Sequence, residues 1–261
     1  MPQTAKTDSL KVASVTKDSF LGGRILVAQP RSGFRAGLDS VMLAAAVNRK
    51  SLHILELGSG VGAAACCVLE SLPESEMVLV EDQTEMLELA EANLKRNGFS
   101  NRAQTICLDV TAKGSEREAA GIGANDFTSI IANPPFFVTG SSTPPPNAER
   151  AAARHMGKGQ LDLWVKTAAA SAAPAGEAIF IHLAQFLPEL LEAFARRFGS
   201  ITVLPIVPRP GEAATRVLVR GIKGSRAPLK LLSPLVLHGK NGRGFAAGAE
   251  RIFRGEGALD W

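Results

Sequence analysis

The residues best suited to chemistry are Asn133-Pro134-Pro135-Phe136, which directly follow an apolar strand pattern. The Asn133 side-chain oxygen and the Pro134 carbonyl can both accept hydrogen bonds from one planar NH₂ group, and the locked φ of proline fixes the direction of that carbonyl. Phe136 offers a ring face for stacking a flat group. Such a corner would hold an amino nitrogen in line with an electrophile, and positioning alone can contribute about 7–11 kcal/mol to catalysis. The same residues could also be an ordinary turn after a strand.

A second candidate site is the glycine-rich turn Gly58-Ser59-Gly60-Val61-Gly62, which lies between a strand pattern and a helix pattern. Glycines allow positive φ and a close approach of the backbone to a ligand. The spacing also fits a dinucleotide-binding turn, in which a pyrophosphate lies at the helix N-terminus. Glu56 favours S-adenosylmethionine over NAD, because its carboxylate can attract a cationic amino group and would do nothing for a pyrophosphate.

Two further acids follow the next two predicted strands. Glu81 ends the second strand and can accept two hydrogen bonds from ribose hydroxyls, which supports an adenosine cofactor of either kind. Asp109 follows the third strand and is placed to accept a hydrogen bond from an adenine amino group. A surface turn residue remains the alternative interpretation of Asp109.

Strand and helix patterns alternate through most of the chain and predict an α/β fold, a mostly parallel sheet with helices on both faces. The predicted strands are 23–29, 53–57, 77–81, 104–108, 126–132, 177–183, 201–207 and 216–220, the last two as a closing hairpin. The predicted helices are 38–47, a segment ending near 71, 84–97, 159–172 and 187–198. Both candidate sites therefore fall where a strand ends.

Length and composition bound the domain organisation. The 261 residues suffice for one α/β domain with a modest appendage. We expect a flexible N-terminal tail at 1–19 and a single domain at 20–261, made of an N-terminal extension (20–50), a catalytic core (51–221) and a basic C-terminal segment (222–261). From Pro205 to Trp261 there are ten Lys/Arg and four Asp/Glu, which would suit a polyanionic partner. His182, in an apolar strand, is interpreted as a core histidine.

The cysteines and the hydrophobic runs indicate a location. Three cysteines, two of them adjacent at Cys66 and Cys67, form no disulfide framework and no zinc-like spacing, and favour a reducing compartment. No apolar run reaches the roughly 18 residues that cross a bilayer, and the N-terminus does not resemble a signal peptide. We expect a cytoplasmic protein with no metal and no membrane contact.

These motifs resemble the class I S-adenosylmethionine-dependent methyltransferases that modify exocyclic amino groups, and more narrowly the bacterial tRNA1(Val) adenine-N6 methyltransferase family. The similarity also includes four further segments: 35–40, Arg154-His155, 216–219 and 237–242. It implies a Rossmann-like class I methyltransferase fold with a mostly parallel seven-stranded sheet, S-adenosylmethionine as cofactor and a nucleic acid, tRNA, as substrate. The family's aromatic residue after Pro-Pro is commonly Tyr, whereas this chain has Phe136 and no Tyr.

The resemblance also implies roles for individual residues. The catalytic loop is Asn133, Pro134, Pro135 and Phe136, and the implied cofactor contacts are Asp39, Glu56, Gly58, Gly60, Gly62, Glu81, Asp109 and Asn133. The substrate contacts that we expect are Arg35, Arg154 and His155. Each of these three could instead be an ordinary surface or loop residue.

Four alternative functions stay open at the level of the sequence. A protein-glutamine N5 methyltransferase also presents a planar NH₂, but such enzymes usually carry a longer helical segment before the catalytic domain. An rRNA guanine-N2 enzyme would show a second, degenerate copy of the domain. An NAD-dependent oxidoreductase has no use for Asn133-Pro134-Pro135-Phe136, and a non-catalytic RNA-binding protein has no need of two intact sites.

Overall fold

The chain folds around one large twisted sheet. The computed structural model describes residues 15–32, 35–135, 137–138, 155–156, 159–259 and 261. The seven long strands lie in the spatial order β5 (Ala103–Cys107), β4 (Glu76–Glu81), β3 (His53–Leu57), β6 (Phe127–Ala132), β9 (Ala172–Leu183), β11 (Arg216–Lys223) and β10 (Phe198–Val207). The predicted α/β fold is confirmed. The sheet has nine strands, not seven, because the two-residue strands β12 (Lys230–Leu231) and β13 (Leu235–Val236) both pair with β10.

The direction of the strands follows from their connections. The strands β5, β4, β3, β6 and β9 are mutually parallel, and parallel strands need a crossover that is usually a helix. The near-continuous apolar runs of β3, β4 and β6 fit a sheet that is covered on both faces, whereas the edge strand β5 is more polar and more exposed. The strand β11 is antiparallel to both β9 and β10, as the predicted closing hairpin requires.

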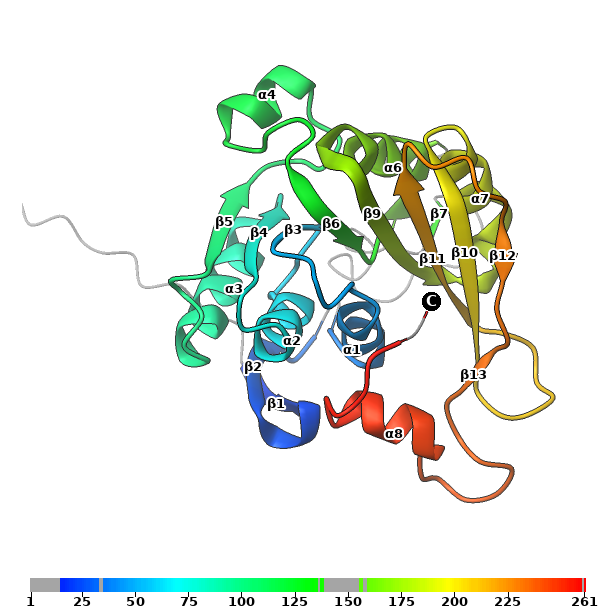
Figure 1. The fold of residues 1–261 in the computed structure, drawn as a ribbon. Helices are drawn as coiled ribbons and strands as arrows, with labels where there is room; N and C mark the ends of the chain where they lie inside the picture. Colours follow the sequence, from blue (N-terminus) through cyan, green and yellow to red (C-terminus); the bar gives the residue numbers. More distant parts are fainter. Residues whose placement is uncertain (1–14, 33–34, 136, 139–154, 157–158, 260) are drawn as a thin grey trace, which may run out of the picture.

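Helices cover both faces of the sheet (Figure 1). One face packs against α1 (Leu38–Ala45), α2 (Ala63–Ser71), α3 (Thr84–Arg96) and α8 (Ala247–Phe253). The other face packs against α6 (Gln160–Ser171) and α7 (Leu187–Ala195). A short helix, α4 (Gly114–Ala119), precedes β6 and has no buried residue. Cys66 and Cys67 are buried free thiols in α2.

The N-terminal boundary differs from the prediction. Residues 15–19, which we assigned to a flexible tail, lie in β1 (Val15–Phe20), and β1 forms an antiparallel hairpin with β2 (Ile25–Pro30) around the 3₁₀ turn η1 (Leu21–Gly23). The side chains of β1 are mostly polar, so its sequence reads as a tail, but backbone pairing with β2 fixes it. The buried Ile25 and Val27 attach the hairpin to the core beside α2 and α3.

None of the described helices has the length and apolar character needed to span a membrane. The five parallel strands all end at one edge of the sheet, which we call the carboxyl edge, and begin at the opposite amino edge. Because ligands of open α/β sheets bind at the carboxyl ends of strands, the carboxyl edge is where the site is sought.

Candidate active site

Strand register brings the predicted site residues together at the carboxyl edge. Leu57, the last residue of β3, lies between Val80 of β4 and Ala132 of β6. The residues that follow these three positions are Gly58, Glu81 and Asn133. Since neighbouring strands lie about 4.8 Å apart, the glycine turn has Glu81 on one side and the Asn133 corner on the other.

The glycine turn needs glycine at each of its three positions. Gly58, Gly60 and Gly62 have φ of 66°, 53° and 73°, values that disfavour residues with a Cβ. A Cβ on Gly58 would lie 2.5 Å from the Trp164 ring, whereas a Cβ on Gly60 would point into open space. Trp164 therefore packs against the turn at Gly58, whereas the turn has free space beside Gly60.

Buried polar contacts hold the turn in place. The Asn93 side chain of α3 donates to the Val61 carbonyl at 2.9 Å and to the Ala28 carbonyl at 2.9 Å, and accepts from the Ala28 N–H at 2.7 Å. Asn93 is fully buried, so it joins the glycine turn to the N-terminal hairpin. The sequence predicts Asn93 only as a member of the inward-facing stripe of the helix at 84–97, with no role at the site.

Two buried carboxylates lie beside the turn. Glu56 accepts from the Ala65 N–H at 3.1 Å, and burial raises its pKa to about 8. Glu81 accepts from the Gly60 N–H at 2.8 Å, and burial raises its pKa to about 7. Glu81 also contributes to raising the pKa of Glu56 through like-charge repulsion. A cation placed against these acids would favour their ionised forms.

Two buried oxygen atoms at this edge have no partner. Among the described residues, Ser59 Oγ and Asn133 Oδ1 are shielded from solvent and make no hydrogen bond. A buried polar atom without a partner costs about 1–3 kcal/mol, and such atoms are rare enough to indicate a ligand. The sequence predicted a role for Asn133, but Ser59 was predicted only as a member of the glycine turn, although it is the one polar side chain in that turn.

The Asn133 corner is supported from behind by a histidine. Pro134 is buried and Pro135 is partly buried. His182 of β9 is 2% exposed, and burial lowers its pKa to about 4, while hydrogen bonds with the Leu183 and Pro135 backbones act in the opposite direction. His182 is thus the buried histidine that the sequence predicts, and it also contacts the corner. Phe136 lies outside the described residues.

Asp39 and Asp109, predicted as cofactor contacts, make other contacts in this structure. Asp39 Oδ2 forms an ion pair with Arg216 Nε at 3.1 Å, which ties the start of α1 to β11. Asp109 is exposed, and its Oδ1 accepts from the N–H and the hydroxyl of Thr111 at 2.6 and 2.7 Å. Glu81 is paired in register with Cys107, so Asp109 lies just beyond the end of β5 and next to Glu81 on the same edge.

The three predicted substrate contacts, Arg35, Arg154 and His155, differ in what the structure shows of them. The Arg35 guanidinium pairs with Asp18 and donates to Thr16 and to the Pro30 carbonyl at 2.7 Å, so it fastens the N-terminal hairpin. Arg154 lies outside the described residues. His155 is described only as backbone, where β8 (His155–Met156) pairs in parallel with β7 (Phe137–Val138) just after the Asn133 corner.

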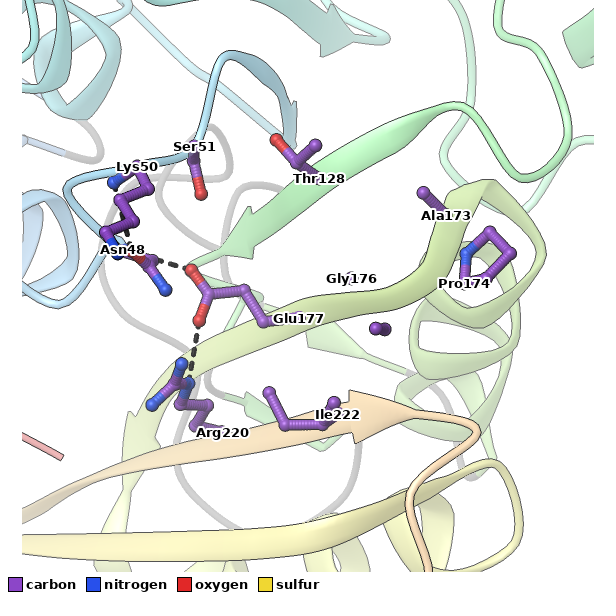
Figure 2. A pocket seen from close by; sticks show the side chains of 11 residues that line it. Asn48, Lys50, Ser51, Thr128, Ala173, Pro174, Gly176, Glu177, Arg220 and Ile222 are labelled. Atoms are coloured by element: carbon purple, nitrogen blue, oxygen red, sulfur yellow. Dashed lines mark hydrogen bonds and ion pairs between the residues drawn. The ribbon is translucent and has the colours of Figure 1, made fainter.

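A cavity of about 190 Å³ lies elsewhere, at the amino edge. Figure 2 shows Glu177 between Asn48 and Arg220 in this cavity, with Lys50, Ser51 and Thr128 on its wall. Glu177 accepts from Ser129 Oγ and Arg220 Nε at 2.9 and 2.7 Å. The acid in this cavity is already paired with Arg220, and ligands of open α/β sheets bind at the carboxyl ends of the strands, so this cavity is not the candidate active site.

The carboxyl edge fits an S-adenosylmethionine molecule on its own geometry. The open side of Gly60 leaves room for a ligand, and the unpaired Ser59 Oγ can contact it. Glu56 matches a cationic amino group and Glu81 matches ribose hydroxyls. The described residues contain no cluster of His, Cys, Asp and Glu that could hold a metal ion.

Sequence comparisons match this chain to a family model and to several named relatives. The family model for the methyltransferase small domain matches residues 36–163, which include the glycine turn and the Asn133 corner. A tRNA1(Val) (adenine(37)-N6)-methyltransferase of Porphyromonas gingivalis is 28% identical over 207 residues, 77% of this chain and 79% of that protein. A protein of the same name from Vibrio parahaemolyticus is 29% identical over 136 residues, 52% of this chain and 53% of that one.

Comparisons of structure agree as well. A crystal structure of a predicted O-methyltransferase from Agrobacterium tumefaciens has a TM-score of 0.72 and 32% identity, and the match covers 85% of this chain and 98% of that one. A 16S rRNA N2 methyltransferase from T. thermophilus, solved with AdoMet and guanosine, has a TM-score of 0.54 at 22% identity over 80% of this chain and 50% of that one, which is a likeness of fold.

Proposed function

This chain belongs to the S-adenosylmethionine-dependent methyltransferases, and we propose that it methylates an exocyclic amino nitrogen, adenine N6 in tRNA. The observation that carries the proposal is the buried, unpaired Asn133 Oδ1 beside the glycine turn. An acceptor that is shielded from water and has no partner among the described residues gains most from a donor on the substrate. The relatives named adenine-N6 methyltransferases support adenine in tRNA as the source of that donor.

The proposed cofactor contacts follow the order of the strand ends. Asp109, Glu81 and Gly58 follow one another along the carboxyl edge, and Asn133 comes next. We assign Asp109 to the adenine and Glu81 to the ribose, and we assign Glu56 with the turn Gly58–Gly62 to the amino acid end. S-adenosylmethionine supplies a methyl group on a sulfonium. Asp39 is assigned an indirect role, because its carboxylate is paired with Arg216.

The corner is assigned the task of orienting the amine. Asn133 Oδ1 and the Pro134 carbonyl accept one hydrogen each from the NH₂ group and so aim the nitrogen lone pair at the methyl group. A hydroxyl has one hydrogen and would leave one of the two acceptors unpaired, which favours an amine over the hydroxyl implied by the name of the Agrobacterium relative. No strong base is required, since the nitrogen can lose its proton after transfer. Pro135 keeps the corner rigid, and Phe136 is proposed to stack on the target base.

The proposed substrate contacts come from the segment after the corner and from the N-terminal hairpin. Arg154 and His155 remain proposed substrate contacts, and the β7–β8 pairing supports a position for His155 near the corner. Arg35 is proposed to act on the substrate only through the hairpin that it holds. A tRNA substrate agrees with the cytoplasmic location predicted from the sequence. The proposal includes a single domain whose boundary moves from residue 20 to residue 15, because β1 pairs with β2.

The test is identification of the product. The full chain is incubated with methyl-labelled S-adenosylmethionine and total tRNA, total rRNA or total protein, and the labelled fraction is digested to nucleosides or amino acids. The expected product is N6-methyladenosine in tRNA, absent with Asn133→Ala. Label in 2′-O-methylribose, in N2-methylguanosine or in N5-methylglutamine would contradict the assignment of adenine N6.

A further inference from the structure

We propose that the loop of residues 238–245, which follows β13, binds unpaired nucleotides of the RNA that flank the reacting adenine. The inference rests on the RNA substrate proposed above and adds a docking surface to it. Figure 1 shows this loop between β13 and α8, at the rim of the molecule. Four observations carry the inference: the shape of the loop, its charge, its exposed ring and its position.

The loop has a defined shape although it contains three glycines at 239, 242 and 244. His238 and Phe245 form an isolated antiparallel bridge across its base. The Arg209 guanidinium donates to the Gly239 carbonyl and to the Gly242 carbonyl, the latter at 2.8 Å. A loop that is already ordered loses less conformational freedom when it binds a ligand.

The charge of the loop is positive and uncompensated. Lys240 and Arg243 are exposed on the loop, and Arg209 lies beneath it. No described carboxylate forms an ion pair with any of these three side chains, whereas Arg254 of the adjoining segment pairs with Glu250 at 2.8 Å. Free cations on a surface attract phosphates and release counterions from a nucleic acid.

An exposed aromatic ring lies among these charges. Phe245 is 37% exposed, which is unusual for so large an apolar side chain. Its ring stacks on His238 at 5.0 Å between centroids with 18° between planes, and it contacts Phe253 at 4.5 Å. An exposed ring flanked by basic side chains binds a base by stacking, and only an unpaired base offers a free face.

The loop lies on the same edge of the sheet as the Asn133 corner. Ala132 of β6 pairs with Phe180 of β9. Further along β9, Leu183 pairs with Arg216 of β11, and Arg216 pairs with Ile206 of β10. Ile206 pairs with Leu235 of β13. Four strand spacings separate β6 from β13, roughly 19 Å. Nucleotides that flank the reacting adenine can span that distance. They could not reach a loop at the opposite edge of the sheet while the adenine lies at the Asn133 corner.

The first experiment removes the charges. Binding of a fluorescent anticodon stem-loop of tRNA1(Val) is measured against salt concentration for wild type and for the double variant Lys240→Ala/Arg243→Ala. The matched control, Arg226→Ala/Lys230→Ala, removes two exposed charges of the same segment at the amino edge, where β12 begins. Loss of two phosphate contacts is expected to reduce the salt slope by about 1.4, and the control should leave it unchanged.

The second experiment tests stacking. Phe245→Leu keeps an apolar contact with Phe253 and removes the flat ring, and Phe245→Tyr restores a ring. Phe245→Leu is expected to weaken binding by about 5- to 150-fold, the range for loss of one base–aromatic stack, with recovery in Phe245→Tyr. Circular dichroism melting of each variant confirms that it is folded.

The outcomes separate this inference from the proposed function. Equal slopes for the two double variants, or equal affinities for Phe245→Leu and wild type, would overturn the docking surface even if adenine methylation is observed. Equal affinity for a duplex RNA of the same length would overturn the assignment to unpaired nucleotides. Methyl transfer to total tRNA, measured separately, tests the proposed function without reference to the loop.

Discussion

The two edges of the sheet hold buried acids in opposite ways. At the amino edge, Glu177 accepts from Ser129 Oγ, from the Asn48 N–H and from Arg220 Nε, at 2.9, 2.9 and 2.7 Å. At the carboxyl edge, Glu56 accepts from the Ala65 N–H at 3.1 Å, and none of the described basic side chains forms an ion pair with it. The paired acid, Glu177, stabilises the fold, and Glu56, which has no basic partner among the described residues, is the acid that we propose to bind the cofactor.

The same contrast holds for neutral groups. The two side-chain oxygens that are buried without a partner among the described residues, Ser59 Oγ and Asn133 Oδ1, both lie at the carboxyl edge. The space beside glycine residues also differs between the two edges. A Cβ on Gly176 would lie 2.9 Å from two carbonyl oxygens, while a Cβ on Gly60 meets open space. Buried oxygens without a hydrogen-bond partner and free space beside the backbone therefore occur together at the carboxyl edge. This combination is expected of a ligand-binding site and not of a packed core.

The largest effect on this comparison should come from Glu177→Gln. Removing one partner of a buried ion pair leaves Arg220 without its carboxylate and is expected to lower the free energy of unfolding by about 3–5 kcal/mol. Urea unfolding monitored by tryptophan fluorescence measures it. Glu56→Gln, the matched change at the other edge, should cost less than about 1 kcal/mol. Equal losses in the two variants would end the distinction between the edges.

Glu81→Gln should affect the ligand more than the fold. Hydrogen bonds to a charged group contribute about 1.5–3 kcal/mol, so the dissociation constant for S-adenosylmethionine should rise about 10- to 150-fold. Isothermal titration calorimetry on the cofactor gives the constant directly. Unchanged cofactor affinity would show that Glu81 does not bind the ribose.

Gly60→Ala and Gly176→Ala form a matched pair with smaller effects. At Gly60 the positive φ costs about 1–2 kcal/mol of stability, and the new methyl group enters the space assigned to the cofactor, which should weaken cofactor binding about tenfold. At Gly176 the methyl group should lower stability through crowding and leave cofactor binding intact. Thermal melting with and without S-adenosylmethionine separates the two. A cofactor-induced shift retained in Gly60→Ala would contradict the proposed position of the ligand.

The two buried acids at the carboxyl edge should also make stability depend on pH. Burial raises the pKa of Glu56 from 4.5 to about 8 and that of Glu81 from 4.5 to about 7. The folded, cofactor-free chain therefore binds more protons than the unfolded chain between these values. The free energy of unfolding should fall as pH rises through this window, by at most about 1.4 kcal/mol per pH unit for each group.

Cofactor affinity should move in the opposite direction. It should increase with pH across the same range, because the ionised acids are the better acceptors. Glu56→Gln should flatten both curves. If the free energy of unfolding of Glu56→Gln varies with pH as in the wild type from pH 5 to 8, Glu56 does not cause the pH dependence.

Much of the framework could be predicted because it depends on local patterns. The strand at 53–57 and the helix at 84–97 follow from apolar periodicity, and their observed bounds, His53–Leu57 and Thr84–Arg96, differ by one residue at most. The position of Asn133 beside the glycine turn follows from the rule that parallel strands end at one edge. These predictions required no knowledge of which distant residues touch.

The contacts that sequence analysis missed are long-range. The Asp39–Arg216 ion pair joins residues 177 positions apart, and nothing in either local sequence announces it. Arg35 looked available for a substrate because its partner Asp18 lay in a segment that reads as a loose tail. Phe245 looked like one more apolar residue, since its exposure depends on how the loop and α8 pack.

The most direct test of the central claim measures stability and turnover together in Asn133→Ala, with Asn101→Ala, an exposed turn residue, as control. Asn133 Oδ1 makes no hydrogen bond with the described residues, so it should be dispensable for folding and needed for substrate. The free energy of unfolding should stay within about 1 kcal/mol of wild type, and the single-turnover rate of methyl transfer to tRNA should fall about 100-fold or more. A variant that loses stability and keeps its methyl-transfer rate would contradict the claim.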